Sequence, residues 1–327
     1  MKLTFKFVAA VSLFTAISAV HAADDYQVPR TEWGQPDLHG VWNFASNIPM
    51  TRPRQFGDRE YMTPEEAEAL AARSEAQFEA LNDDGVGGYN TFWVESAGIG
   101  ENLRTSLITY PENGQFPPMV EGTKVQIGGL GPDFKGQRPV LVTVGGISKD
   151  GPEDRGLSER CIVGFNSGPP FTPSMYNNNV QIVQNKDTVV IITEMIHDAR
   201  IVPLDNRPHV DDSIRLWTGD SRGYWEGDTL VVETRNFNNL TQSFVVFGDS
   251  YDKVLTEKFT RVDDYTVNYE FTVDDPSTFK DKIVARVPMS KVDGLMYEYA
   301  CHEGNYGMTN ILRGERIAEE RESETSQ

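Results

Sequence analysis

The sequence contains little cysteine and little histidine, with two and five residues of these types among 327. No pair of either type has the spacing of a zinc site. The sequence also has no phosphate-binding G-x-x-x-x-G-K-[ST] loop and no dinucleotide fingerprint after a strand, which argues against the common nucleotide-binding motifs. We therefore expect no cofactor and no metal, although the aspartate pairs Asp211–Asp212 and Asp274–Asp275 leave a calcium site open.

Long hydrophobic runs are also absent, except at the start of the chain. Lys2 and Lys6 precede an apolar stretch from Phe7 to Val20, and small residues end it at Ala22. This pattern is typical of a secretory signal peptide over residues 1–22, and the stretch is too short to span a bilayer comfortably. No later run approaches the roughly 20 residues of a membrane helix. We expect a soluble bacterial protein, periplasmic or secreted, with no membrane partner.

Basic residues are scarce, since 30 Lys and Arg stand against 49 Asp and Glu for a formal charge of −19. Such a surface repels nucleic acid, so we expect no nucleic-acid partner. Hydrophobic residues make up 39% of the chain, which is enough for a large core. We find no linker between domains, and we predict one domain over residues 23–317 and a frayed, charged tail over residues 318–327.

The two cysteines, Cys161 and Cys301, both follow the predicted signal peptide. In an oxidising compartment two cysteines most simply form one disulfide, and two buried free thiols are the alternative. The bond would close a loop of about 140 residues and contribute at most about 4–5 kcal/mol in the chain-entropy model.

Alternating β-prone runs occupy the chain from Asn179 to His302. The clearest are Leu255–Arg261 and Thr266–Asp274, which are joined across a polar turn. Further strands are expected at residues 180–184, 188–195, 223–225, 229–234, 283–287 and 296–301. Because no helix separates these runs, we predict eight or nine antiparallel strands. That many sequential strands tend to close into a barrel or to fold into a sandwich.

The N-terminal part contains one predicted strand and one predicted helix. Residues 38–44 alternate and are typical of a first strand. Thr63 as N-cap, Pro64 at the first helical position and Glu66 in a capping box predict a helix over residues 63–82. Residues 83–178 are rich in loop signals, and we expect them to pack on the sheet.

Three stretches resemble a family of uncharacterised exported bacterial proteins, and this resemblance covers most of the chain after the predicted signal peptide. They are Glu159–Cys161 with Gly168–Pro170 and Tyr176–Asn179, Tyr224–Thr234, and Tyr297–Tyr306. This resemblance implies no activity. Separately, Gly40-Val41-Trp42 is similar to the Gly-x-Trp of the first strand in lipocalin-like barrels. That resemblance implies an all-β, antiparallel up-and-down barrel with one N-terminal helix and inserted loops around its mouth.

The densest polar stretch of the sequence begins at Glu194. Acid–base chemistry needs groups that titrate near neutral pH, which histidine supplies. If residues 193–202 form one strand, His197 faces away from Glu194, Asp198 and Arg200, which share the other face. These three residues line a ligand pocket in one interpretation and form a structural ion pair in the other.

A second polar group lies at the end of the last predicted strand. Tyr299 belongs to this strand, and His302 and Glu303 follow it, where loop residues often carry chemistry. A set of Tyr, His, carboxylate and Arg suits the abstraction and return of a proton. The alternative is a loop that is rigid because a disulfide at Cys301 lies beside it.

We predict an exported enzyme that acts on a small or medium organic substrate by acid–base chemistry, with a lyase or isomerase ahead of a hydrolase. The predicted catalytic residues are His197, Asp198, Arg200, Tyr299, His302 and Glu303. The predicted substrate-binding residues are Tyr176, Asn178, Glu194, Arg207, His209, Trp225 and Tyr306. Asparagines before a strand are more often turn formers. The alternative function is a lipocalin-like periplasmic carrier of a hydrophobic ligand, and a scaffold or adhesion module is a third, weaker one.

Overall fold

The computed structural model describes residues 26–82, 103–126 and 148–325, so the predicted signal peptide lies outside the described residues. The strands are β1 (Gly40–Asn43), β2 (Ile108–Tyr110), β3 (Asn179–Gln184), β4 (Thr188–Thr193), β5 (Ala199–Pro203), β6 (Asp220–Glu226), β7 (Thr229–Arg235), β8 (Val254–Arg261), β9 (Thr266–Asp274) and β10 (Ile283–Val292). The helical segments are η1 (Arg54–Phe56), α1 (Pro64–Asn82), η3 (Pro152–Asp154), η4 (Met195–His197) and α2 (Tyr306–Thr325).

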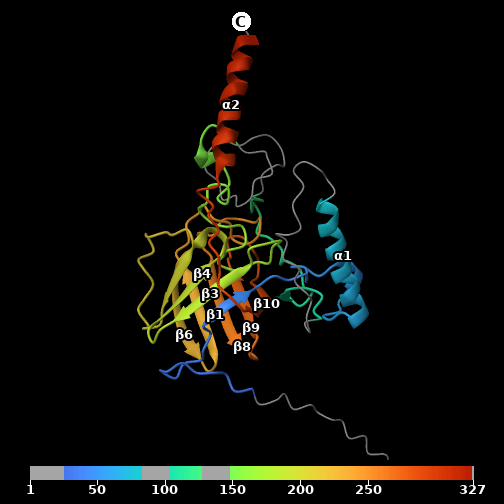
Figure 1. The fold of residues 1–327 in the computed structure, drawn as a ribbon, viewed down its shortest axis with the longest axis vertical. Coiled ribbons are helices and arrows are strands. Elements are labelled where there is room, and N and C mark those ends of the chain that lie inside the picture. Colours follow the sequence, from blue (N-terminus) through green and yellow to red (C-terminus); the bar gives the residue numbers. More distant parts are fainter. Residues whose placement is uncertain (1–25, 83–102, 127–147, 326–327) are drawn as a thin grey trace, which may run out of the picture.

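Nine of the strands form a nearly closed antiparallel barrel (Figure 1). Neighbouring strands follow the order β5-β4-β3-β1-β10-β9-β8-β7-β6, and β2 pairs with β10 beside this path. The two ends of the order, β5 and β6, pack against each other, because a β-carbon at Gly223 would lie 2.7 Å from Val202 Cγ1. The strands therefore run around the barrel in the order of the sequence. This confirms the predicted all-β, up-and-down architecture.

The predicted hairpins form with the expected partners. β8 pairs with β9 from Val254 opposite Asp274 to Arg261 opposite Val267. β3 pairs with β4, and β6 pairs with β7, across short polar turns at residues 185–187 and 227–228. The alternation of apolar residues sets this register, because a shift by one residue would turn every inward side chain toward solvent.

Alternate side chains of the strands fill the barrel interior. Leu255, Phe259, Tyr269 and Phe271 are each fully buried, and every second residue of β8 and of β9, on the opposite face, is more exposed. The ring centroids of Phe259 and Tyr269 lie 5.0 Å apart, and those of Tyr269 and Phe271 lie 5.6 Å apart. The barrel is thus packed with side chains over most of its length and is not an empty tube.

The lower end of the barrel, where the turns at residues 185–187, 227–228 and 262–265 lie, is closed by the chain that leads into β1. The buried Trp42 donates a hydrogen bond from Nε1 to the Leu38 carbonyl oxygen (2.9 Å). The guanidinium of Arg261 lies over the Trp42 ring, 5.7 Å from its centroid, and donates a hydrogen bond to a backbone carbonyl of the lead-in.

The upper end, where the links at residues 194–198, 236–253 and 275–282 lie, carries the long loops. The disulfide Cys161–Cys301 joins the loop before β3 to the segment after β10, across 140 positions of sequence. Both cysteines pack beside Met195 and Ile196 of η4. The predicted disulfide is therefore confirmed, and it connects the loops that cover this end.

The two long helices differ in how well the sequence predicts them. The capping box of α1 is present, since the Thr63 N–H donates to Glu66 Oε2 (2.9 Å) and the Glu66 N–H donates to Thr63 Oγ1 (3.3 Å). By contrast, α2 projects from the upper end in Figure 1 and has no buried residue. Residues 318–325 of this helix lie where we expected a frayed tail.

One predicted strand was wrong, and a second one, which the sequence left conditional, does not form. Residues 193–202 are not one strand, because β4 ends at Thr193, η4 turns the chain and β5 starts at Ala199. Ile196 in this turn has a φ of 62°, which a β-branched residue rarely adopts. The faces assigned to the polar side chains of this stretch were therefore wrong as well. Residues 296–301 form no strand either, whereas β10 extends further than predicted, to Val292.

Candidate functional site

Arg200 lies inside the barrel in a buried ion pair. Its guanidinium donates two hydrogen bonds to the carboxylate of Glu257, one of them 3.0 Å long. The side chains of Arg200 and Glu257 are 7% and 0% exposed. Burial disfavours the arginine cation, but the charge and hydrogen bonds of Glu257 outweigh this effect and raise the pKa of Arg200.

Tyr269 completes this buried cluster. Its hydroxyl donates to Glu257 Oε1 (2.7 Å) and accepts the backbone N–H of Phe171 (3.1 Å). Burial and the charge of Glu257 raise the pKa of Tyr269 well above its ordinary value. Each polar group of the cluster contacts another, and neither cavity described below is lined by any of the three residues. The cluster is therefore part of the packed interior.

The other predicted catalytic residues lie at the upper end of the molecule. Tyr299 packs beside the disulfide with Tyr176, and burial raises its pKa. His302 and Glu303 lie on an exposed turn before α2. The structure therefore places these residues outside the barrel interior, away from the buried cluster of Arg200.

The segment around η4 contributes two further predicted residues. Asp198 is the C-cap of η4, and its carboxylate accepts the N–H of Ala199 (3.1 Å). The side chain of His197 lies outside the described part of the chain. Because Tyr299 packs on Met195 and Ile196, the structure brings this segment and the segment after β10 together, but it does not gather the predicted catalytic set around one cavity.

Asn178 and Glu194, which we predicted to bind substrate, both make hydrogen bonds within the protein. The fully buried Asn178 accepts the N–H of Ser174 (2.8 Å) and donates to its carbonyl oxygen (3.0 Å). Glu194 Oε2 accepts a hydrogen bond from Asn179 Nδ2 (2.8 Å). For Asn178 this contact matches the turn-forming alternative.

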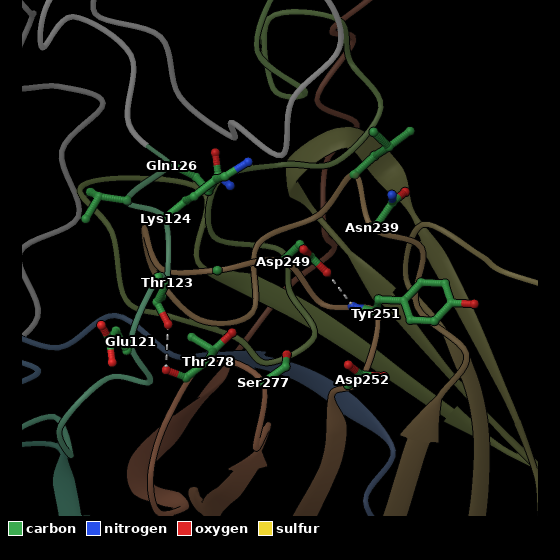
Figure 2. A pocket seen from close by; sticks show the side chains of 14 residues that line it. Glu121, Thr123, Lys124, Gln126, Asn239, Asp249, Tyr251, Asp252, Ser277 and Thr278 are labelled. Carbon is green, nitrogen blue, oxygen red and sulfur yellow. Dashed lines mark hydrogen bonds between the residues drawn. The ribbon is translucent and has the colours of Figure 1, made fainter.

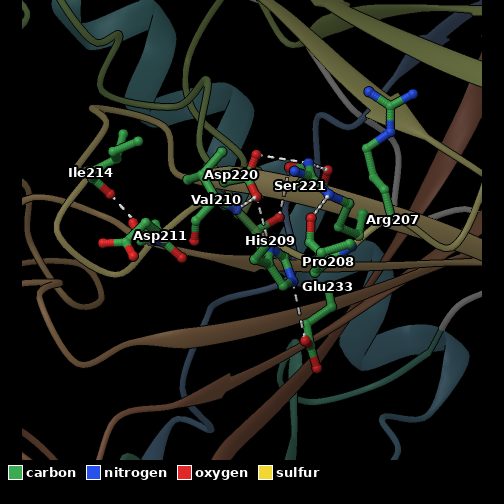
Figure 3. Close-up of polar contacts among 12 residues, drawn as sticks. Arg207, Pro208, His209, Val210, Asp211, Ile214, Asp220, Ser221 and Glu233 are labelled. Atoms are coloured by element: carbon green, nitrogen blue, oxygen red, sulfur yellow. Dashed lines mark hydrogen bonds and ion pairs between the residues drawn. The ribbon is translucent and has the colours of Figure 1, made fainter.

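His209 lies on the outer face of the barrel between two carboxylates (Figure 3). Its Nδ1 lies 2.8 Å from Asp220 Oδ2, and its Nε2 lies 3.3 Å from Glu233 Oε1. Arg222 and Arg235 in turn contact these carboxylates at 2.7 and 2.8 Å. The cluster fastens the chain between β5 and β6 to the barrel wall.

The remaining predicted binding residues lie in three separate places. Arg207 is largely exposed and pairs with Asp205. Tyr306 is 75% exposed at the start of α2. Trp225 packs against the core, and among the described residues its Nε1 has no hydrogen-bond partner. These residues do not share a site with one another.

A cavity of about 450 Å³ opens among the loops of the upper end. It lies between the loop that precedes β3 and the link between β7 and β8. Its walls are mostly apolar, and they include Phe165, Trp217, Phe237 and Phe244. A volume of this size falls within the range of small-molecule sites, which are concave and mostly apolar with a few polar groups.

Among the described residues that line this cavity Lys253 is the one cation, and it is 4% exposed. Its Nζ donates to the carbonyl oxygens of Gln242 (3.4 Å) and Ser243 (3.2 Å) and lies 4.1 Å from the centre of the Phe237 ring. Burial lowers the pKa of Lys253 to about 8, against the opposing charges of Asp275 and Glu257. A buried lysine that remains partly neutral near physiological pH can bind an anion or act as a base or nucleophile.

Lys253 was not among the residues predicted from the sequence, although the sequence contains a signal for it. Lys253 lies two positions before Leu255 and four before Glu257, in the register of the inward side chains of β8. Extending that alternation by one step would have placed its ammonium group inside. Ser243, whose buried Oγ has no partner among the described residues, carried no comparable signal.

A larger cavity of about 990 Å³ lies beside the first and has a different chemical character (Figure 2). Its lining includes Glu121, Asp249 and Asp252, with Lys124 and Tyr251 on opposite sides. The guanidinium of Arg215 lies 3.8 Å from the centre of the Tyr251 ring. The lining of this cavity is more polar than that of the first cavity.

Two classes of feature are absent from the described residues. No group of three or more His, Cys, Asp or Glu side chains in that part of the chain is arranged to hold a metal ion. No helix described in the structure is both long and apolar enough to cross a membrane.

Comparisons with known proteins do not assign this chain to a family. No protein-family model matches the chain, and no curated protein matches it.

Proposed function

We propose that this protein binds a small organic molecule in the cavity at the upper end of the barrel. The apolar body of the molecule would lie against Phe237 and Phe244, and its anionic or carbonyl head group would reach Lys253. The observation that carries this proposal is a buried lysine in a mostly apolar cavity, with no carboxylate in ion-pair contact among the described residues.

The energetics of this site favour such a ligand. Each Å² of apolar surface removed from water contributes about 25 cal/mol, so the aromatic wall supplies affinity. The buried ammonium group is poorly solvated, and an anionic group beside it would restore much of the lost interaction. Recognition of the head group and burial of the body would therefore act together.

Acid–base catalysis in the same cavity is the second candidate. It keeps the predicted lyase or isomerase chemistry but assigns the base to Lys253, whose pKa of about 8 leaves a substantial neutral fraction. His302 and Glu303 would then have no part in the reaction. Conversion of a bound molecule, rather than its unchanged release, would separate this candidate from a carrier.

We also propose that the chain is an exported, lipocalin-like barrel protein. The Gly-Val-Trp segment lies in β1, the first strand of the barrel, and Trp42 is buried at the closed lower end. The disulfide Cys161–Cys301 agrees with an oxidising compartment.

Titration with anilinonaphthalene sulfonate tests the binding proposal. This probe combines fused apolar rings with one permanent negative charge, and its fluorescence rises in an apolar site. We expect saturable binding to the wild-type protein, and we expect affinity to fall about tenfold or more in Lys253→Met, which keeps the length of the side chain and removes its charge.

Lys258→Met is the matched control, because Lys258 lies on the outer face of β8 with its side chain 43% exposed. It should bind the probe as the wild type does. If Lys253→Met folds poorly, Lys253→Arg provides a second test. Because it retains the charge, it should retain part of the affinity for the probe. Equal affinity in the wild type, Lys253→Met and Lys258→Met would refute the assignment of this cavity.

A further inference from the structure

We propose that Lys253 forms an imine with the carbonyl carbon of an aldehyde or ketone bound in the cavity, so that the ligands of this site are carbonyl compounds with an apolar body. This inference rests on the proposed function, because it uses the same cavity and the same lysine. It goes further by naming a covalent step and the functional group that the ligand must carry.

The hydrogen bonds of Lys253 leave its nitrogen open to a ligand. The neutral amine has two N–H groups, and the carbonyl oxygens of Gln242 and Ser243 are two acceptors at 3.4 and 3.2 Å. Nitrogen is tetrahedral, so its lone pair takes the remaining direction. No further acceptor contacts Nζ among the described residues, and the face of Phe237 at 4.1 Å belongs to the same cavity.

The surroundings of Lys253 keep part of the amine neutral. Burial lowers the pKa of this group to about 8, so about one molecule in ten carries the neutral amine near pH 7. An ordinary exposed lysine is neutral in fewer than about one molecule in a thousand at that pH. Only the neutral amine attacks a carbonyl, and desolvated lysines are the ones that proteins use for this step.

Two carboxylates near Lys253 oppose the effect of burial on its pKa. Asp275, which is 1% exposed, and Glu257 both favour the ammonium form. The charge of Glu257 is already matched by Arg200, and neither carboxylate is in ion-pair contact with Lys253 among the described residues. Burial therefore remains the dominant influence on the amine.

Ser243 supplies a hydroxyl to the same cavity, and its backbone carbonyl contacts Lys253 Nζ. Its side chain lines the cavity, and its buried Oγ has no hydrogen-bond partner among the described residues. A buried polar group without a partner is costly, so a ligand oxygen that accepts its hydrogen bond would be favoured. We assign Ser243 to the carbonyl oxygen of the bound molecule, as a positioning residue.

The step balances without a further reactant. The ammonium group first loses one proton to water, and the neutral nitrogen then attacks the carbonyl carbon. The carbonyl oxygen leaves as water with the two hydrogens of the amine, and a carbon–nitrogen double bond forms. When the imine is protonated, it keeps one N–H for the carbonyls of Gln242 and Ser243.

Reductive trapping with naphthaldehyde tests the inference. This aldehyde has an apolar body and no hydrogen on the carbon beside its carbonyl, so it cannot form an enol. With cyanoborohydride present, each imine becomes a stable secondary amine that peptide mapping by mass spectrometry locates. We expect the adduct at Lys253 to exceed that at the exposed Lys258 about tenfold or more near pH 7, since the neutral fractions differ by more than that factor.

The pH dependence and two variants sharpen the test. The trapping yield at Lys253 should rise as the pH increases through about 8, whereas binding of the sulfonate probe should weaken over the same range. Ser243→Ala should lower the yield at Lys253 several-fold and leave the yield at Lys258 unchanged. Lys253→Met should abolish the adduct in the cavity.

Displacement of the sulfonate probe by naphthaldehyde separates the two proposals. If the aldehyde displaces the probe and no adduct forms at Lys253, the imine is overturned and the binding site stands. If the aldehyde neither displaces the probe nor labels Lys253 above Lys258, the imine is overturned, and both proposals are overturned if Lys253→Met also binds the probe as tightly as the wild type.

Discussion

Two buried cations in the same barrel differ in their surroundings. Arg200 makes two hydrogen bonds to a fully buried carboxylate, which also accepts a hydrogen bond from Tyr269. Lys253 contacts two backbone carbonyls and an aromatic face, and it lines a cavity. A cation whose charge is already matched contributes structure, whereas a cation without a carboxylate in contact remains available to a ligand. The comparison therefore supports the proposed binding site at the upper end of the barrel rather than a site in its centre.

Loss of the partner of Arg200 should have the largest effect. Glu257→Gln leaves the guanidinium buried without a countercharge, which costs about 3–5 kcal/mol of unfolding free energy. Urea denaturation measures this loss. Glu270→Gln is the control, because Glu270 pairs with Arg286 on the outer face and should cost at most about 1 kcal/mol. Similar losses in both variants would contradict the burial of the Arg200–Glu257 ion pair.

The pH dependence of stability should distinguish the second cation. The folded-state pKa of Lys253 lies below its unfolded value, so between about pH 8 and 10.5 the unfolded chain binds more protons than the folded protein. Stability linked to Lys253 is therefore lowest below about pH 8 and rises by about 3 kcal/mol across this range. Comparison of wild type and Lys253→Met by urea denaturation at several pH values isolates this contribution, and parallel curves would show that the lysine is not buried.

The third member of the inner cluster should have an intermediate effect. Tyr269→Phe removes a donor to Glu257 and leaves the N–H of Phe171 without its acceptor, which costs about 1–3 kcal/mol. Tyr265→Phe is the control, because Tyr265 is 69% exposed and should change stability by less than about 0.5 kcal/mol. Thermal unfolding of the two variants makes the comparison, and an unchanged midpoint for Tyr269→Phe would contradict the proposed cluster.

The cluster on the outer face should have the smallest effect. His209→Ala removes contacts to the buried Asp220, which keeps its ion pair with Arg222, and to the partly exposed Glu233, and should cost about 1 kcal/mol. Its affinity for the sulfonate probe should equal that of the wild type, because His209 does not line the cavity. A large loss of probe affinity in this variant would place the binding site on the barrel wall.

The barrel could be predicted because its signals are local. Alternation in Leu255–Arg261 and Thr266–Asp274, with a polar turn between them, specifies both strands and their register. The disulfide followed from the presence of only two cysteines, Cys161 and Cys301. The hairpin followed from a local pattern and the disulfide from the number of cysteines. Neither prediction needed knowledge of which distant parts of the chain are in contact.

The candidate site could not be predicted in the same way. Ile196, in the turn between β4 and β5, packs beside the disulfide, and no local pattern reveals this contact. Because the sequence did not predict this turn, the side chains of Asp198 and Arg200 were assigned to the wrong positions. The predicted site residues were chosen because polar residues are frequent in their stretches of sequence. The frequency of polar residues does not indicate which of them are buried. Lys253 stood in a stretch with the composition of a loop, and only the register of the following strand indicated that it points inward.

A crystal structure of the complex with anilinonaphthalene sulfonate tests the central claim most directly. We predict electron density for the fused rings between Phe237 and Phe244, with a sulfonate oxygen within hydrogen-bond distance of Lys253 Nζ. Density for the probe beside Tyr251 in the larger cavity, or beside His302, with none next to Lys253, would contradict this account.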